Sequence, residues 1–239
     1  MNFDEVIAAL NKPQINGDEL FEAISFAEDG LLEAGREDFQ ALDIAIRLLD
    51  ALRREAIKSE STDPVSFLAR DCGLFPYIDP SAFRLINRTL IAAHTINLEH
   101  KVTLHAKQME VLLSLLNGDN VILSAPTSFG KSLIVDALIK LKRPTTVIMV
   151  VPTIALIDET RRRIARHLPD YHIISYRNQV REAAPRTAYV LTQERLLERQ
   201  DITEIDLLFV DEFYKLDPTR DDERFEPFEC RTLSKHSKS

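Results

Sequence analysis

The sequence predicts an α/β protein in which a helical N-terminal region, to about residue 100, precedes an incomplete, doubly wound parallel sheet. Apolar residues in the first 60 positions recur at the 3.6-residue spacing of a helix. After residue 104, apolar runs of strand length alternate with helical segments, the pattern of a parallel sheet covered on both faces. Hydrophobic residues make up 45% of the chain and charged residues 28%, which is typical of a globular protein.

The helical region begins at Asn2, a plausible N-cap. A later helix is indicated by one apolar stripe, made of Leu42, Ala45, Ile46, Leu49, Leu52 and Ala56. Residues 59–104 are less periodic and are interrupted by turn signals at 63–64, 71–73 and 79–80, followed by an apolar segment at 85–93. We therefore expect residues 1–100 to form a helical region, with a linker or boundary near 95–103.

The α/β part opens with a predicted helix over 105–116, which ends at Asn117-Gly118. The strands expected after it cover residues 121–125, 146–151, 172–176, 188–191 and 207–210. Residues 217–239 have no apolar period and are expected to form a disordered tail.

Composition excludes several classes of protein. The chain has two cysteines, Cys72 and Cys230, too few and too far apart for a disulfide framework or a zinc site. The N-terminus is acidic where a signal peptide would be basic, so we expect a cytoplasmic protein without a membrane partner. The net charge of −8 disfavours nucleic-acid binding by bulk charge, so any such contact must be local.

A phosphate-binding loop is predicted directly after the apolar run 121–125 and before a helix. Its residues are Ala125, Pro126, Thr127, Ser128, Phe129, Gly130, Lys131 and Ser132. Backbone N–H groups in such a turn suit a polyphosphate, with Lys131 placed for the β- and γ-phosphates and Ser132 for Mg²⁺. The strict motif begins with Gly, and Ala125 stands in that place. The alternative interpretation is a turn without a ligand.

Two carboxylates, Asp211 and Glu212, follow the apolar run 207–210. Acidic side chains at the carboxyl end of a buried strand are costly unless each has a task. Asp211 can hold a metal ion through water, and Glu212 can orient or deprotonate an attacking water. The pair therefore indicates hydrolysis, against the alternative of a solvated acidic turn.

Together these motifs resemble the first RecA-like domain of a superfamily 2 helicase of the DEAD/DEAH-box type. The resemblance covers residues 104 to about 216, implies a P-loop NTPase fold over 101–216, and implies ATP and Mg²⁺ as cofactors. It places Gln108 where the family's Q motif recognises adenine; the alternative is an exposed helical glutamine. It gives Glu212 and Lys131 catalytic roles and makes Asp211 and Ser132 the side chains that hold Mg²⁺ with ATP.

The same resemblance implies contacts to single-stranded DNA or RNA. Pro152 and Thr153 match motif Ia, and Thr192 and Arg195 match a later single-strand contact motif, in which Gln193 replaces the usual proline. A basic cluster on the helix after motif Ia could attract a phosphate backbone; it consists of Arg161, Arg162, Arg163, Arg166 and His167. The alternative for this cluster is a solvated helix face.

Two parts of the family's machinery have no match in this sequence. No Ser-Ala-Thr motif or apolar strand follows residue 212, and a second RecA-like domain with its arginine finger is absent. We therefore expect the ATP-binding N-terminal part of an ATP-dependent helicase or translocase, truncated before motif III. It should be inactive for unwinding without a second helicase domain or a partner chain. The main alternative is a non-catalytic nucleotide-binding interaction module, with a bacterial defence system as the setting considered. A small P-loop kinase would need a lid, for which residues after 217 offer no candidate.

Overall fold

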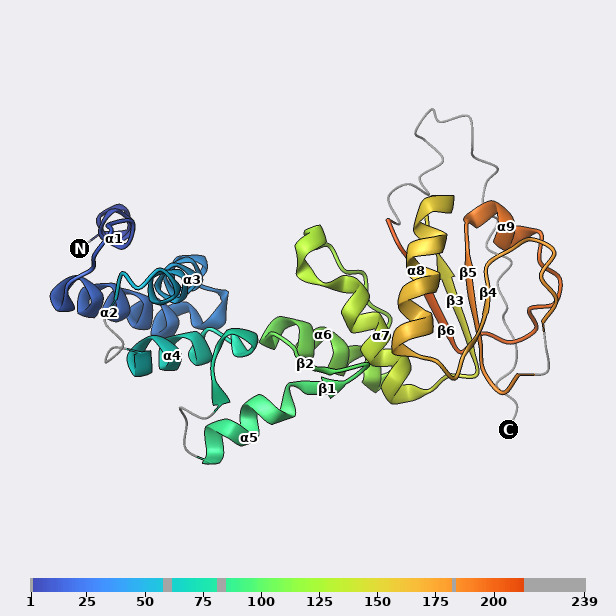
Figure 1. Cartoon of the computed structure of the whole chain (residues 1–239), viewed down its shortest axis with the longest axis horizontal. Coiled ribbons are helices and arrows are strands. Elements are labelled where there is room, and N and C mark those ends of the chain that lie inside the picture. The colour runs from blue at the N-terminus through green and yellow to red at the C-terminus, as the bar shows by residue number, and fades with distance from the viewer. Residues whose placement is uncertain (1, 58–61, 81–84, 182–183, 213–239) are drawn as a thin grey trace. The chain divides into compact units, whose positions relative to one another are not determined.

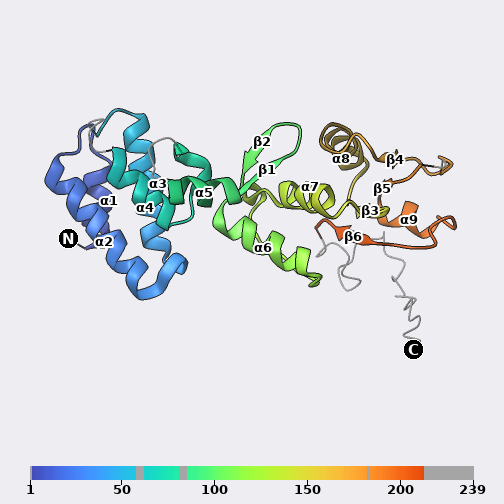
Figure 2. The same cartoon turned by 90° about the horizontal axis from the view of Figure 1, so that it is seen from below.

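The computed structural model describes residues 2–57, 62–80, 85–181 and 184–212. It divides into two compact units, Met1–Lys142 and Arg143–Ser239 (Figures 1 and 2). The expected tail at 217–239 and Cys230 lie outside the described residues.

The first unit begins with helices whose N-termini are capped as the sequence predicts. These are α1 (Phe3–Leu10), α2 (Gly17–Ala34) and α3 (Phe39–Arg53), with a 3₁₀ turn at Gly35–Glu37. Asn2 and Asn16 each accept a backbone hydrogen bond and form a capping box with Glu5 and Glu19, respectively. Asp38 caps α3 by accepting from two backbone N–H groups.

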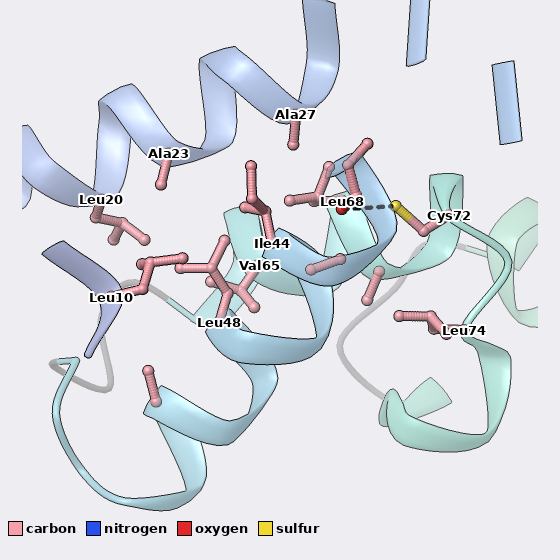
Figure 3. Close-up of a cluster of buried hydrophobic side chains, with 14 of the residues drawn as sticks. Leu10, Leu20, Ala23, Ala27, Ile44, Leu48, Val65, Leu68, Cys72 and Leu74 are labelled. Atoms are coloured by element: carbon pink, nitrogen blue, oxygen red, sulfur yellow. Dashed lines mark hydrogen bonds between the residues drawn. The ribbon is translucent and has the colours of Figure 1, made fainter. Parts of the chain in front are cut away.

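A continuous apolar core joins these helices to α4 (Thr62–Asp71), the 3₁₀ turn Phe75–Tyr77 and α5 (Leu85–Ala93). Figure 3 shows Leu10, Ile44, Leu48 and Leu68 turned toward one another in this core. Cys72 belongs to it, and its thiol donates to a backbone carbonyl (Figure 3). Burial raises the pKa of that thiol to about 12, so it stays protonated and serves packing.

The buried face of α3 agrees with the predicted stripe only in part. Of that stripe, Ala45 is buried, Leu42, Leu49 and Leu52 pack partly buried against the core, and Ile46 is 48% exposed. Ile44 and Leu48, outside the stripe, are fully buried. The helix carries apolar residues around much of its circumference, so periodicity alone did not select the face. The small side chains of Ala41, Ala45 and Ala51 mark the buried side, where neighbouring helices pack against α3.

The stretch expected to be a linker near 95–103 is a β-hairpin. Strands β1 (Thr95–Asn97) and β2 (Lys101–Thr103) pair antiparallel, with Thr95 opposite Thr103. Helix α6 (Ala106–Asn117) follows and ends at Gly118, which adopts the left-handed conformation with φ of 98°. This C-terminus confirms the signal in the sequence.

The expected strand at 121–125 is wrong. These residues are irregular and belong to neither sheet, and Ile122 is 91% exposed. An apolar run forms a strand only where a neighbouring strand satisfies its backbone N–H and C=O groups, and no described strand pairs with this one. Helix α7 (Lys131–Lys142) follows, as expected.

The second unit is a parallel sheet with the order β4-β5-β3-β6. Its elements are β3 (Thr146–Val150), α8 (Ile154–His167), β4 (His172–Ile174), β5 (Thr187–Leu191), α9 (Gln193–Leu197) and β6 (Leu207–Val210). In Figure 2, α8 and α9 lie on opposite sides of the strands. The predicted fold class is therefore confirmed: a helical N-terminal region precedes a parallel α/β core consistent with an incomplete RecA-like fold.

Burial differs across this sheet. Every residue of β3 and β5 is buried, whereas β6 is only partly covered and Leu208 is 51% exposed.

Within the described ranges, no helix combines the length and the apolar character needed to span a membrane.

Candidate nucleotide site and nucleic-acid surface

The predicted phosphate-binding loop is a tight turn at the start of α7. A short 3₁₀ turn, Thr127–Phe129, is closed by the Phe129 N–H, which donates to the Pro126 carbonyl over 3.1 Å. Gly130 follows with φ of 78°, a left-handed conformation that side chains disfavour. Its carbonyl accepts from the N–H groups of Leu133 and Ile134, so the helix begins directly after the turn.

The side chain of Lys131 bonds to the backbone at the start of the same loop. Its ammonium Nζ donates to the carbonyl oxygen of Ala125 over 2.6 Å, spanning the turn. An ammonium held beside a ring of backbone groups gives a compact positive site. The loop thus keeps its lysine in place before any ligand arrives.

Gln108 is not the exposed helical residue of the alternative interpretation, because only 5% of it is accessible. Its Oε1 accepts from the backbone N–H of His105 over 2.8 Å, which caps α6. Its Nε2 donates to the carbonyl of Phe129 over 2.7 Å. A Cβ added at Gly130 would lie 2.8 Å from that Nε2. One side chain therefore joins the start of α6 to the phosphate loop.

The residues of this loop fit a nucleotide polyphosphate with its magnesium ion. Lys131 supplies a cation, and the left-handed Gly130 lets the backbone approach a ligand without a Cβ in the way. Ser132, in the first turn of α7, offers the hydroxyl oxygen that suits Mg²⁺.

Asp211 and Glu212 stand at the carboxyl end of β6, in the second unit. The Asp211 N–H donates to the Val150 carbonyl over 2.9 Å and continues the pairing of β6 with β3. Its carboxylate accepts from the N–H of Glu212 over 3.0 Å, and Glu212 has φ of 50°. Both residues are half-buried, unlike a fully solvated acidic turn.

Three residues predicted to contact nucleic acid follow the carboxyl ends of strands in the same sheet: Pro152, Thr153 and Thr192. From β3 the chain runs to β4 and β5 on one side and to β6 on the other, so Pro152 and Thr153 follow the strand where this order reverses. Thr153 caps α8 by accepting from the Leu156 N–H over 3.3 Å. Thr192 is only 7% exposed and follows the neighbouring strand β5. Parallel α/β sheets bind ligands at such reversal points.

The family model "DEAD/DEAH box helicase" matches residues 105–226, which is slightly more than half of the chain. The chain belongs to the DEAD/DEAH box helicase family. The model "Anti-bacteriophage protein B N-terminal domain" matches residues 1–88. One curated relative, Anti-bacteriophage protein B of Escherichia coli (strain K12), is 41% identical over 177 residues, which is 73% of this chain and 24% of the relative.

The structure distributes the predicted site residues of this DEAD/DEAH box domain between the two units. Gln108 and the loop 125–132 come together in the first unit. The second unit brings together Pro152, Thr153, Thr192, Asp211 and Glu212 at one edge of its sheet.

Arg195 lies on α9, the helix that follows Thr192. Its guanidinium donates to the carbonyl of Ser175, just after β4, over 3.0 Å. In the basic cluster, Arg161 pairs with Asp158 at 3.5 Å, and Arg166 donates to the Arg162 carbonyl over 3.4 Å. Arg162 and Arg166 are exposed on α8 and could meet a phosphate backbone.

Sequence reasoning missed a buried clamp around the segment after β4. Arg199, with a side chain only 7% exposed, pairs with Asp201 at 2.6 Å and donates to the Gln179 carbonyl over 2.9 Å. The Tyr189 hydroxyl donates to Asp201 over 3.1 Å. Hydrogen bonding from Arg199 holds the pKa of the Asp201 carboxyl below its usual range. The spacing Arg-x-Asp at 199–201 was the available signal.

Proposed function

We propose that this chain provides the ATP-binding part of an ATP-dependent helicase or translocase that acts on nucleic acid in defence against bacteriophages. The observation that carries the proposal is the hydrogen bond between Gln108 and Phe129, because it connects the adenine-reading position of the family to the phosphate loop. The family match supports the helicase assignment, and the relative's name supports the defence role.

In this proposal five of the predicted site residues have defined tasks. Lys131 would leave the Ala125 carbonyl and neutralise the β- and γ-phosphates, while Gln108 would select adenine over guanine. Ser132 and Asp211 would hold Mg²⁺, which supplies neutralisation of charge on the phosphates. Glu212 would orient the attacking water and accept its proton. We place this ATP-binding domain at 101–216, after a helical region that ends near residue 100.

Nucleic acid would contact the second unit. Residues 1–57 contain 13 acidic and 5 basic side chains, an excess equal to the net charge of −8 of the whole chain. Because phosphates repel such a surface, we assign single-stranded nucleic acid to the carboxyl edge of the sheet, with Pro152, Thr153, Thr192 and Arg195 as its contacts. Binding by this chain alone would be weak.

A second RecA-like domain or a partner chain would supply the arginine finger. The chain spans about a quarter of the length of the curated relative that it matches. Loss of the finger lowers phosphoryl-transfer rates by roughly 10³ to 10⁵. We therefore propose that this chain binds ATP but does not unwind a duplex without such a domain or partner.

A non-catalytic nucleotide-binding module is the second candidate. The irregular segment 121–125, in which Ile122 is 91% exposed, favours this candidate. A strand was expected at this segment, and it would have connected the phosphate loop to the sheet. Such a module would bind ATP without any hydrolysis that depends on Glu212.

Equilibrium binding of a fluorescent ATP analogue with Mg²⁺ tests the proposal. Removing the Lys131 charge should weaken binding at least tenfold, since hydrogen bonds to charged groups contribute about 1.5–3 kcal/mol. Lys142→Ala, an exposed lysine at the other end of α7, is the matched control for Lys131→Ala. Equal affinity of the wild type and Lys131→Ala would refute the phosphate-loop assignment.

A further inference from the structure

Gly73, in the helical region, contacts the start of α6 directly. It follows α4 in a left-handed turn, with φ of 75°. Its carbonyl accepts from the Ala106 N–H, the first helical residue of α6, over 3.0 Å. A Cβ added at Gly73 would lie 2.5 Å from the Cβ of Ala106, a distance that real side chains do not tolerate. The close approach therefore requires glycine at 73.

Further contacts from the helical region converge on the same end of α6. Glu37, in the 3₁₀ turn after α2, forms an ion pair with Lys107. The Tyr77 ring lies 5.4 Å from the His105 ring, measured between centroids. Ala106 itself packs against the apolar core of the helices. The start of α6 is thus fixed by the part of the chain that matches the anti-phage N-terminal domain.

From there the contacts continue into the phosphate loop. The His105 N–H donates to Gln108 Oε1 over 2.8 Å, and Gln108 Nε2 donates to Phe129 over 2.7 Å. A shift of the α6 N-terminus must therefore move Gln108 or break one of these two bonds. Close-packed contacts transmit such shifts rather than absorb them.

We propose that Gly73 is a positioning residue for adenine-nucleotide binding, acting through Ala106 and Gln108. The inference rests on the proposed function, since it assumes that Gln108 and the phosphate loop hold ATP. It adds that the helical N-terminal region sets nucleotide affinity and base selectivity. By linkage, a ligand of the helical region that displaces the Gly73 turn lowers ATP affinity, and ATP opposes that ligand equally.

Gly73→Ala, measured with fluorescent ATP and GTP analogues and Mg²⁺, tests this. Overpacking at Ala106 should weaken ATP binding about fivefold or more and reduce the preference for ATP over GTP. Gly118→Ala is the matched control, because Gly118 has φ of 98° at the other end of α6 and an added Cβ meets nothing within 4 Å. It carries the backbone strain without the collision, so its affinity and selectivity should stay near the wild type.

Rescue separates positioning from general destabilisation. In Gly73→Ala/Ala106→Gly the colliding Cβ at 106 is gone, so ATP affinity and base preference should return toward those of Ala106→Gly alone. The proposal is overturned if Gly73→Ala binds both nucleotides like Gly118→Ala, or if the double variant shows no recovery. If the wild type itself does not bind ATP, the proposed function fails, which is a distinct result.

A charge reversal decides the matter should Gly73→Ala not fold. Lys107 pairs with Glu37 from the helical region and, at 3.3 Å, with Glu110 of α6 itself. All three side chains are largely exposed, so neither reversal disturbs a core. Glu37→Lys should weaken ATP binding, whereas Glu110→Lys, with the same change in net charge, should not. Equal effects of the two would contradict the proposal.

Discussion

The phosphate loop and the carboxylate pair are held in opposite ways. The loop is tied down by side chains: Lys131 reaches Ala125, and Gln108 reaches Phe129 from a helix fixed to the N-terminal core. The carboxylates are positioned by the backbone pairing of β6 with β3, and β6 is only partly covered. The loop is therefore fixed by contacts within the first unit, whereas the carboxylates lie at the end of a strand that is only partly covered.

The largest expected effect is on ATP hydrolysis, which should be far weaker than ATP binding in this chain. We expect turnover by this chain near background, lower by roughly 10³ to 10⁵ than with an arginine finger, because we assign that finger to a second RecA-like domain or a partner chain. A steady-state ATPase assay with and without single-stranded nucleic acid measures it. Glu212→Gln should leave ATP binding unchanged. Robust stimulated turnover that Glu212→Gln abolishes would show that self-association or a partner completes the site.

Stability should differ almost as much between the two regions. Leu48→Ala, at a fully buried position in the helical core, should cost about 2–5 kcal/mol in the free energy of unfolding. Leu208→Ala, at a position 51% exposed on β6, should cost well under half of that. Denaturant titration of both variants provides the comparison. A larger cost at Leu208 would mean that β6 is covered in solution by something other than the described residues.

Nucleic-acid binding should respond only to changes in the second unit. Reversing Arg162 and Arg166 to Glu should weaken single-strand binding about tenfold and flatten its salt dependence, since each contact to a phosphate releases counterions. Reversing Arg53 and Arg54 to Glu in α3 and its cap is the control of equal charge change. Binding that is unaltered by the α8 reversal would assign those arginines to a solvated helix face.

The smallest expected effect is a pH dependence at the start of α6. Burial lowers the pKa of His105 below its usual value of about 6.5, so the folded state favours the neutral ring. Its contribution to stability is present above pH 6.5 and is lost as the pH falls through the lowered pKa. The melting temperature should therefore drop less between pH 7.5 and 5 in His105→Gln than in the wild type. Parallel curves would remove His105 from this account.

Local signals predicted most of the fold. The caps at Asn2 and Gly118 and the strands β3, β5 and β6 follow from side-chain chemistry within a few residues. The strand expected at 121–125 failed because strand formation depends on a partner that sequence pattern cannot supply. The stripe predicted for α3 was right only in part, because several faces of that helix are apolar.

The candidate site was predictable in its residues but not in its connections. The loop, Gln108 and the carboxylates were found from motif spacing, and their roles stay predictions. The contact of Gly73 with Ala106 and the Arg199 clamp depend on pairs distant in sequence or on burial. A single sequence carries no signal for such pairs beyond a glycine or a charge in an unexplained place.

Hydrogen exchange with and without ATP and Mg²⁺ tests the central claim most directly, that nucleotide is held by the loop and α6. Backbone amides of bound or rigidified segments exchange more slowly, so the method reports each segment of the full chain separately. In the wild type we expect ATP and Mg²⁺ to slow exchange over 125–134 and in α6, with little change in β5. In Lys131→Ala we expect ATP to change the exchange of these segments little. Protection confined to the second unit, or none at saturating ATP, would contradict it.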